Sequence, residues 1–439
     1  MVTLRRIILL LVVSLLALSI TMNILAASPR VDVITVKGTI NPVLTDYIER
    51  GIEQAESTGA SVIVFQMDTP GGLDTAMRDI IQEITNSRIP VVVYVAPSGA
   101  RAASAGMYIT LSAHVAVMAP NTAIGAATPV QLGGDGEAQM SDELKAKVIN
   151  DASAYARSLA ESRDRNPEWA ERAVREGVSL TAVEALELNV IDMIAPDLSS
   201  LVLQLDGREV TMLGGNIVTL DTKDATINNI DMTLIEDFLY TIADPNIAYL
   251  LLSLATLGIM VEVFNPGLIF PGVVGGISLL LAFYSLGVLP VNWAGVLLIV
   301  LAFGLFVAEL LTTTFGLLTA GGIISLVIGS LILFQGASPV FRVDPWLIAT
   351  VTIVITATFA FVMNRALIAH RRQAKTGREE LPGKVAVVRE ALDPEGSVFY
   401  KGELWEAVSE SGRVEPREEV TIIKVDGLRL YVTKKEGKE

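Results

Sequence analysis

The sequence predicts an α/β domain, a multi-span α-helical membrane domain and a small all-β domain, in that order along the chain. Up to about Asp244, strand-length apolar runs alternate with segments of helical pattern. Residues 245–364 are almost wholly apolar, and the chain is charged again from His370 onward. A net charge of −15, spread along the polar parts, argues against nucleic acid as a partner.

The N-terminus has the pattern of a secretory signal peptide over residues 1–27. Arg5 and Arg6 precede an apolar run, and the small residues that end at Ala27 suit cleavage by a signal peptidase. An uncleaved anchor helix is the alternative. With either outcome, we expect the residues that follow to lie outside the cytoplasm.

Residues 28–200 predict a parallel sheet covered by helices, because continuous apolar strands alternate with helical segments. The expected strands are 31–36, 61–66, 91–95 and 115–118, with helices at 42–56 and 73–85. Ligands of such sheets bind at the carboxyl ends of the strands. Two segments of small residues lie there, namely the turn that contains Gly71 and Gly72, and residues 98–109.

Ser104 is a candidate nucleophile because it opens a helix after the third strand. Ala105 and Gly106 leave room for another backbone, and a helix N-terminus presents free N–H groups to developing negative charge. The N–H groups of Gly72 and Ala105 form a candidate oxyanion hole, since glycine lets the backbone of the turn approach closely. The alternative is a serine N-cap beside an ordinary strand-to-helix turn.

Neither of the two histidines is a good base for this serine. His114 enters a strand only a few residues after the candidate nucleophile, and His370 follows the apolar block. Two histidines also exclude a histidine-based metal cluster, and the absence of cysteine excludes a thiolate nucleophile, a disulfide and a cysteine-ligated metal. We therefore expect neither metal nor cofactor, and a lysine is the remaining base.

Two lysines, Lys145 and Lys147, lie on a helix expected over residues 142–163. They flank its apolar stripe on opposite sides, so periodicity does not choose between them. A lysine base must be neutral near pH 7, which requires its pKa to fall by about three units. The alternative for Lys147 is a solvated side chain paired with Asp151 one helical turn later.

Three segments resemble the long form of the NfeD family: M-D-T-P-G-G-L, A-P-S-G-A-R-A-A-S-A-G, and the run that begins K-V-I-N-D-A-S-A-Y. The resemblance implies a membrane-anchored serine protease domain of the ClpP/crotonase fold. It implies Ser104 as the nucleophile, Lys147 as the base, and Gly71 and Gly72 in the oxyanion-hole loop. Lys145 stays a lesser candidate, because a glycine-rich loop at 133–136 precedes the helix.

The same resemblance implies an ATP-independent serine endopeptidase with a Ser-Lys dyad. Its substrate would be a hydrophobic peptide segment of a stomatin- or prohibitin-family membrane protein, which would also be its partner, and the protease would form a homo-oligomer. The alternative is a non-catalytic membrane scaffold that organises stomatin-like proteins.

Residues 201–244 alternate weakly and are expected to form a β-rich connector. The transmembrane domain at 245–364 divides into about five spans of bilayer length. The expected spans are 247–263, 273–289, 294–310, 315–334 and 346–363. Glu309, near the end of the third span, is expected at the membrane interface.

A basic linker at 365–382 follows the last span and is expected to face the cytoplasm. Residues 383–439 contain five short strands, as in a small barrel. The run P-E-G-S-V-F-Y-K-G-E-L-W resembles the OB-fold C-terminal domain of the NfeD family. We therefore expect a multi-pass protein of the cell membrane, with the protease domain outside the cytoplasm and the OB-fold domain inside.

Overall fold

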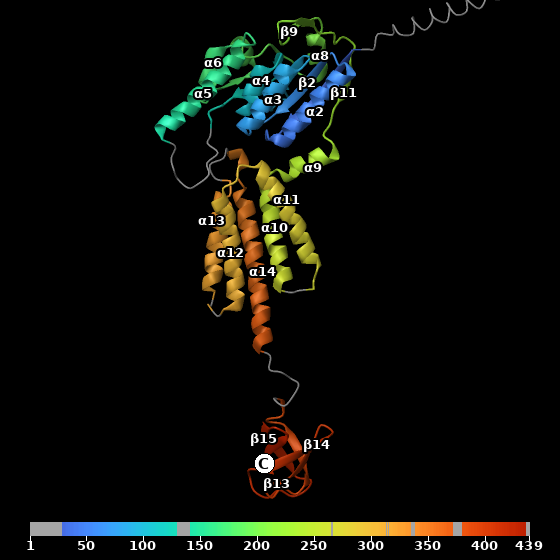
Figure 1. Cartoon of the computed structure of the whole chain (residues 1–439), viewed down its shortest axis with the longest axis vertical. Helices are drawn as coiled ribbons and strands as arrows, with labels where there is room; N and C mark the ends of the chain where they lie inside the picture. Colours follow the sequence, from blue (N-terminus) through green and yellow to red (C-terminus); the bar gives the residue numbers. More distant parts are fainter. Residues whose placement is uncertain are drawn as a thin grey trace, which may run out of the picture. The chain divides into compact units, whose positions relative to one another are not determined.

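The computed structural model describes residues 29–129, 141–264, 267–312, 314, 316–334, 339–371 and 380–435. The expected signal peptide at 1–27 and the glycine-rich loop at 133–136 lie outside these residues. The chain divides into two compact units, Met1–Thr356 and Ala357–Glu439, and Figure 1 shows its elements along the sequence.

A six-stranded parallel sheet forms the centre of the first domain and confirms the predicted α/β fold. Its order is β11-β1-β2-β3-β5-β8, and every neighbouring pair is parallel. The strands are β1 (Arg30–Lys37), β2 (Val62–Asp68), β3 (Val91–Val95), β5 (Val115–Met118), β8 (Met193–Ile194) and β11 (Thr226–Asn229). Strands β3 and β5 are buried along their whole length, as expected of a sheet covered on both faces.

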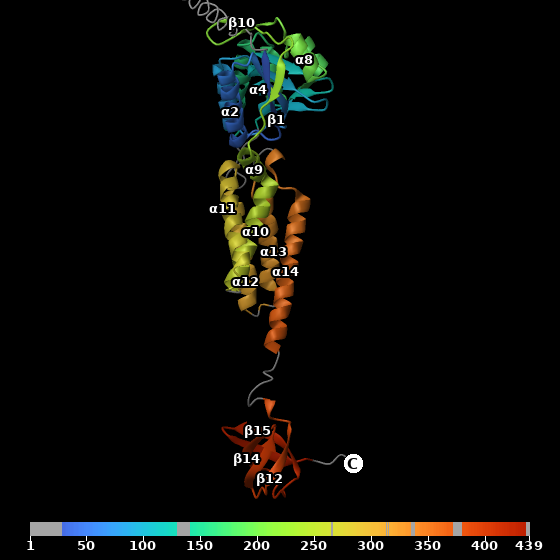
Figure 2. The same ribbon diagram turned by 90° about the vertical axis from the view of Figure 1, so that its right-hand side faces the viewer.

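Helices cover the two faces of this sheet (Figure 2). One face carries α2 (Pro42–Thr58), α3 (Asp74–Asn86) and α4 (Ala105–Ser112). On the other face, alternate residues of β1, β2, β3 and β5 pack with α8 (Leu198–Leu205) and with the β9–β10 hairpin (Glu209–Thr211 and Ile217–Thr219). Successive side chains of a strand point to opposite faces of the sheet, so each strand contributes buried side chains to both layers.

Residues 201–244 contain the strands β9, β10 and β11, as expected of a β-rich segment, but they do not form a separate connector. Leu201 and Leu205 of α8 are fully buried in the core of the first domain, and β11 extends its sheet by pairing with β1. The segment is therefore part of the α/β domain. Only α9 (Leu234–Ile242) leads on to the apolar block.

A second, three-stranded sheet borders the region of Ser104. It consists of β4 (Arg101–Ala103), β6 (Ala123–Gly125) and β7 (Ser179–Thr181), in the order β4-β6-β7. Beside it lie α5 (Asp142–Glu161), α6 (Pro167–Arg175) and α7 (Ala182–Glu187). This small sheet is not predicted by the sequence, because three-residue strands are too short to show a period.

Five helices form the apolar block, in the regions where spans are predicted. They are α10 (Pro245–Phe264), α11 (Phe270–Val288), α12 (Trp293–Leu311), α13 (Leu317–Ile332) and α14 (Pro345–Arg371). In the described residues, the first three are long and apolar enough to cross a bilayer, and Leu317–Ile332 and Pro345–Phe361 are shorter apolar helices. The Glu309 carboxylate of α12 accepts from the backbone N–H groups of Gly316 and Thr319, so this acid caps the next helix.

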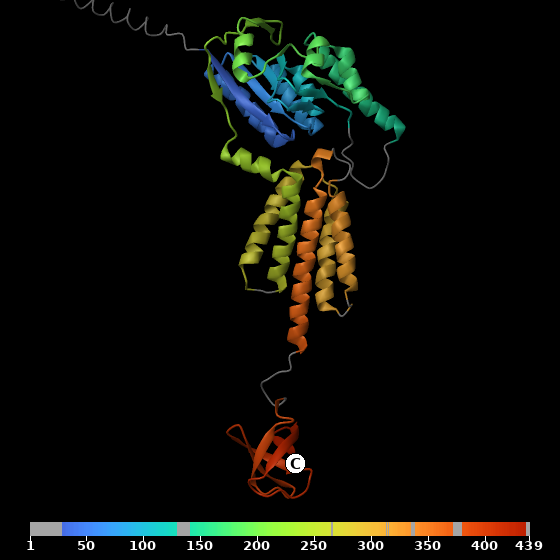
Figure 3. The same ribbon diagram turned by 180° about the vertical axis from the view of Figure 1, so that it is seen from behind.

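The C-terminal unit contains a closed five-stranded barrel, in accord with the predicted OB-fold (Figure 3). Its order is β12-β13-β14-β16-β15, and β14 pairs with β16 in parallel while the other pairs are antiparallel. The strands are β12 (Val385–Glu390), β13 (Glu395–Tyr400), β14 (Glu403–Ser409), β15 (Glu419–Asp426) and β16 (Arg429–Lys434). Buried valine, isoleucine and leucine side chains fill the barrel.

Candidate active site

Ser104 occupies a strained turn between β4 and α4. Its backbone has φ 53° and ψ −116°, a conformation that costs a non-glycine residue about 1–3 kcal/mol. A strand-turn-helix of this kind holds a serine hydroxyl out from the backbone. Ser104 stands at the N-cap of α4, but its side chain makes no capping hydrogen bond. The hydroxyl is half-buried and is not used to stabilise the helix.

Two glycines hold the turn in place. The Ser104 N–H donates to the Gly125 carbonyl at 3.0 Å, and a Cβ on Gly125 would lie 2.3 Å from the Val178 carbonyl oxygen. A Cβ on Gly106 would lie 2.5 Å from Cγ2 of Thr69, so the first turn of α4 packs directly on the end of β2. The close approach expected at Gly106 is present, whereas the contribution of Gly125 was not predicted.

The Gly71–Gly72 turn lies against Ser104. Gly71 has φ +113°, and a Cβ there would lie 2.7 Å from the Ser104 Cβ and 3.2 Å from its Oγ. A Cβ on Gly72 would lie 2.1 Å from the Ile40 carbonyl oxygen. Both positions therefore require glycine. The structure brings together the two small-residue segments that follow β2 and β3.

The backbone donors of this site differ in availability. The Gly71 N–H donates to the Thr69 Oγ1 at 3.0 Å, so it is already used. In the part of the chain that the structure describes, no hydrogen bond uses the N–H of Gly72 or of Ala105. Two unpaired donors thus flank the Ser104 turn, as an anion-binding site requires.

The two candidate lysines lie on the first turns of α5 and are exposed. Among the described residues, no ion pair or side-chain hydrogen bond includes either amine, so neither is bonded to the Ser104 hydroxyl. Lys147 is solvated, as in the alternative interpretation, but in the described residues it forms no ion pair with Asp151, which pairs with Arg78 at 3.1 Å.

Only the C-terminal half of α5 is packed on the domain. The Tyr108 hydroxyl of α4 donates to the Ala152 carbonyl at 3.2 Å, and its ring stacks on Tyr155. In the N-terminal half, Leu144 is 47% exposed and Val148 is 38% exposed. This half projects beyond the rest of the α/β domain (Figures 1 and 3). Part of the apolar stripe predicted on the helix is therefore uncovered.

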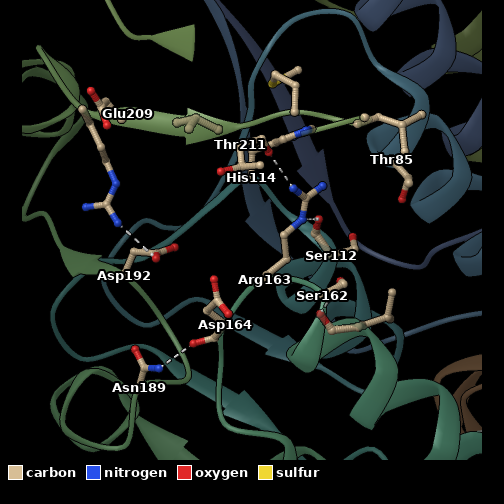
Figure 4. Close-up of a pocket in the computed structure, with 16 residues that line it drawn as sticks. Thr85, Ser112, His114, Ser162, Arg163, Asp164, Asn189, Asp192, Glu209 and Thr211 are labelled. Carbon is tan, nitrogen blue, oxygen red and sulfur yellow. Dashed lines mark hydrogen bonds and ion pairs between the residues drawn. The ribbon is translucent and has the colours of Figure 1, made fainter. Parts of the chain in front are cut away.

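His114 lies at the amino ends of the parallel strands, whereas Ser104 follows the carboxyl end of β3. It precedes β5, and its Nδ1 accepts from the Val91 N–H at 3.2 Å. Burial, with Arg163 and Arg165 nearby, lowers the pKa of His114 to about 3, so the ring is neutral. It borders a polar cavity of about 530 Å³ at the amino ends of the strands, shown in Figure 4. The histidine does not reach the serine.

Three family models match successive parts of this chain. They are the NfeD1b N-terminal domain at residues 30–229, the NfeD integral membrane domain at 246–365, and the NfeD-like C-terminal, partner-binding domain at 378–434. The membrane-bound protease PH1510 of Pyrococcus horikoshii is 39% identical over 96% of this chain and 99% of its own length. The chain belongs to the NfeD family.

A second relative and a solved structure are also similar to this chain. The membrane protein NfeD1b of Bacillus subtilis is 30% identical over 94% of this chain and 95% of its own length. A solved structure of a mutant 1510-N membrane-bound stomatin-specific protease with a substrate peptide is 36% identical. The match covers 49% of this chain and 98% of the solved chain, with a TM-score of 0.46. This NfeD chain has the predicted three-part architecture, including an integral membrane domain.

Proposed function

We propose that this NfeD protein is a membrane-bound serine endopeptidase with Ser104 as its nucleophile. The observation that carries the proposal is the strained Ser104 turn, which packs against Gly71 and is flanked by the N–H groups of Gly72 and Ala105, for which the described residues provide no acceptor. Backbone strain at an uncapped serine is costly, and such strain is found at sites where it serves a function. Membership of a family that includes a membrane-bound protease supports the same conclusion.

In the proposed reaction, neutral Lys147 takes the proton of the Ser104 hydroxyl while the oxygen attacks a peptide carbonyl. The carbonyl oxygen becomes negative and is held by the N–H groups of Gly72 and Ala105. The lysine then gives its proton to the leaving amine, and an acyl-enzyme remains. Water attacks the acyl group as the lysine takes the water proton, and the returned proton restores the serine.

The Lys147 amine has to move to Ser104 before it can act as the base, since Lys147 is exposed and makes no side-chain hydrogen bond or ion pair with the described residues. We propose that the N-terminal half of α5 closes over Ser104 when substrate binds. Lowering the pKa of a lysine by about three units costs about 4 kcal/mol. Burying the exposed parts of Leu144 and Val148 returns about 2 kcal/mol, and burial of substrate must supply the rest. A hydrophobic segment suits this role better than a polar one.

We further propose the substrate and the placement of the domains from the family resemblance. The substrate is a hydrophobic segment of a stomatin- or prohibitin-family membrane protein, and the protease works as a homo-oligomer. The α/β domain lies outside the cytoplasm, because a signal-peptide pattern precedes it. The barrel lies inside, because the basic linker at 365–382 precedes it.

The test is cleavage of a panel of hydrophobic peptides, including C-terminal stomatin segments, by the full chain in lipid nanodiscs. We expect Ser104→Ala and Lys147→Ala to abolish cutting, and Lys145→Ala to retain it as the matched control. Cutting by Ser104→Ala contradicts the mechanism, and cutting by Lys147→Ala contradicts the dyad.

A scaffold is the second candidate function, because the family description of residues 378–434 is a partner-binding domain. Such a scaffold would organise stomatin-like proteins without cleaving them. A folded wild type that cuts no peptide, yet binds a stomatin-family protein through its barrel, would favour this function over the protease.

A further inference from the structure

Helix α9 (Leu234–Ile242) joins the α/β domain to the first membrane helix and has two different faces. Leu234 is 91% exposed, Ile235 71% and Phe238 49%. At 100° per residue these side chains lie on one side of the helix, and Glu236 and Tyr240 lie on the other. Three large apolar side chains are thus uncovered on a helix that ends three residues before α10 begins at Pro245.

The opposite face of α9 is bound firmly to the α/β domain. Glu236 forms a two-pronged ion pair with Arg50 of α2, at 2.7 and 2.8 Å. The hydrogen bonds from Arg50 lower the pKa of Glu236 to about 2, so the carboxylate is charged at neutral pH. The Arg50 guanidinium also donates to the Asp231 carbonyl at 2.9 Å. The helix is therefore held at its start by a charge-assisted contact.

Tyr240 binds the segment that follows β1. Its hydroxyl lies 2.8 Å from the Lys37 carbonyl oxygen and 3.2 Å from that of Thr39. Gly38, between them, has φ +91°, and a Cβ there would lie 2.5 Å from the Tyr240 hydroxyl oxygen. The glycine is thus required for the tyrosine to dock.

The other side of the same segment holds the Gly71–Gly72 turn. The Gly38 N–H donates to the Asp68 carbonyl at 2.9 Å, and the Ile40 N–H donates to the Gly71 carbonyl at 3.0 Å. The Leu73 N–H donates in return to the Ile40 carbonyl at 2.9 Å. Residues 37–40 are therefore bonded both to Tyr240 and to the candidate oxyanion turn.

At its other end, α9 contacts a membrane helix. The Ser285 hydroxyl of α11 donates to the Ile242 carbonyl, the last residue of α9, at 2.5 Å. The axis of α9 runs across the direction of α10, as Figures 1 and 3 show. A helix with this position and one uncovered apolar face matches those that lie in the plane of a lipid–water interface.

We propose that α9 lies on the bilayer surface with Leu234, Ile235 and Phe238 in the lipid interface. We propose also that Tyr240 is a positioning residue that links this helix to the Gly71–Gly72 turn. The second part rests on the proposed function, whereas the first does not. The occupant of the apolar face is lipid, because α9 ends three residues before α10 begins and its last carbonyl is bonded to Ser285 of α11. This sets the face beside the ends of two helices that are long and apolar enough to cross a bilayer.

Depth-dependent quenching tests the lipid contact. The chain contains no cysteine, so Leu234→Cys or Phe238→Cys supplies a single site for an environment-sensitive fluorophore on the full chain in vesicles. Leu203→Cys is the matched control, because Leu203 is 69% exposed on α8. We expect lipids with a spin label high on the acyl chain to quench the α9 sites strongly and the control site weakly. Equal quenching at all three sites overturns the proposal.

Kinetics of Tyr240→Phe test the positioning role. We expect kcat to fall about tenfold with KM nearly unchanged, since the lost hydrogen bonds act on the turn and not on substrate contacts. Tyr94→Phe is the matched control, because the Tyr94 hydroxyl also donates to a backbone carbonyl, that of Ala195, at 2.9 Å. A kcat loss no larger than that of Tyr94→Phe overturns the role.

The two failures can be told apart. If Ser104→Ala cuts as well as wild type, the proposed function is wrong, and quenching still tests the position of α9 because it needs no activity. If Ser104→Ala is inactive while Tyr240→Phe is fully active, only the positioning role is wrong.

Discussion

The Ser104 turn and the N-terminal half of α5 differ in how they are held. Ser104, Gly71 and Gly72 are fixed by backbone hydrogen bonds and by contacts that tolerate no Cβ. Lys147 lies on an exposed helix end whose Leu144 and Val148 are uncovered. A nucleophile and an anion site can thus be preorganised while the base remains apart. A protease built in this way would cleave only those peptide segments whose binding brings the base to the nucleophile, and other proteins that it encounters would not be cleaved.

Among the substitutions that test this comparison, Gly72→Ala has the largest expected effect, because Gly72 belongs to the fixed turn beside Ser104. The new Cβ would meet the Ile40 carbonyl oxygen at 2.1 Å, so the turn must shift and move its N–H. Loss of one oxyanion donor typically lowers kcat about 100- to 1,000-fold. Peptide cleavage rates measure the loss. Gly59→Ala is the control, with positive φ but no atom within 4 Å of the new Cβ, and equal losses in both variants would contradict a specific role.

Leu144→Ser tests the uncovered half of α5 and should have a smaller effect. If this half closes over a hydrophobic substrate, the lost apolar contact is about 1 kcal/mol and kcat/KM falls about five- to tenfold. Thermal stability should not change, because Leu144 is 47% exposed before substrate binds. Val183→Ser on α7 is the matched control, since Val183 is 58% exposed. An unchanged kcat/KM for Leu144→Ser would indicate that α5 does not close in this way.

His114→Gln should have the smallest effect on activity. It tests whether the base lies at the amino ends of the strands, where His114 is, or on α5. We expect kcat to change less than about twofold, since a base on α5 leaves no role for this ring. Loss of cutting in a folded His114→Gln variant would indicate that the histidine is the base. It would contradict the assignment of the base to the exposed half of α5.

The same variant has a defined effect on pH dependence. The pKa of His114 falls from 6.5 to about 3 on folding, so the folded state binds fewer protons than the unfolded state between these values. The free energy of unfolding of the wild-type protein therefore declines as pH falls through this window. This group contributes at most about 1.4 kcal/mol per pH unit to the decline. Thermal melting of wild type and His114→Gln across the window should show a flatter profile for the variant.

Local sequence determines those elements of this protein that follow from the spacing of apolar residues and from the residue types of the turns. Apolar runs such as Val91–Val95 predict buried parallel strands, because only a sheet covered on both faces buries every residue of a strand. The glycines of the Gly71–Gly72 turn and the helix start at Ser104 indicate a site at the carboxyl ends of those strands. The helices described in the apolar block and the strands described in the barrel follow from hydropathy and alternation in the same way.

Tertiary structure alone decides what long-range hydrogen bonds and packing create. The strand β11, T-I-N-N, has no apolar pattern, and it joins the sheet through backbone pairing with β1. The Thr69 hydroxyl accepts from the Gly71 N–H, whereas among the described residues no hydrogen bond uses the Gly72 N–H. Tyr240 reaches residues 37–39 across some two hundred positions. No local pattern records such contacts, because each depends on where a distant part of the chain has folded.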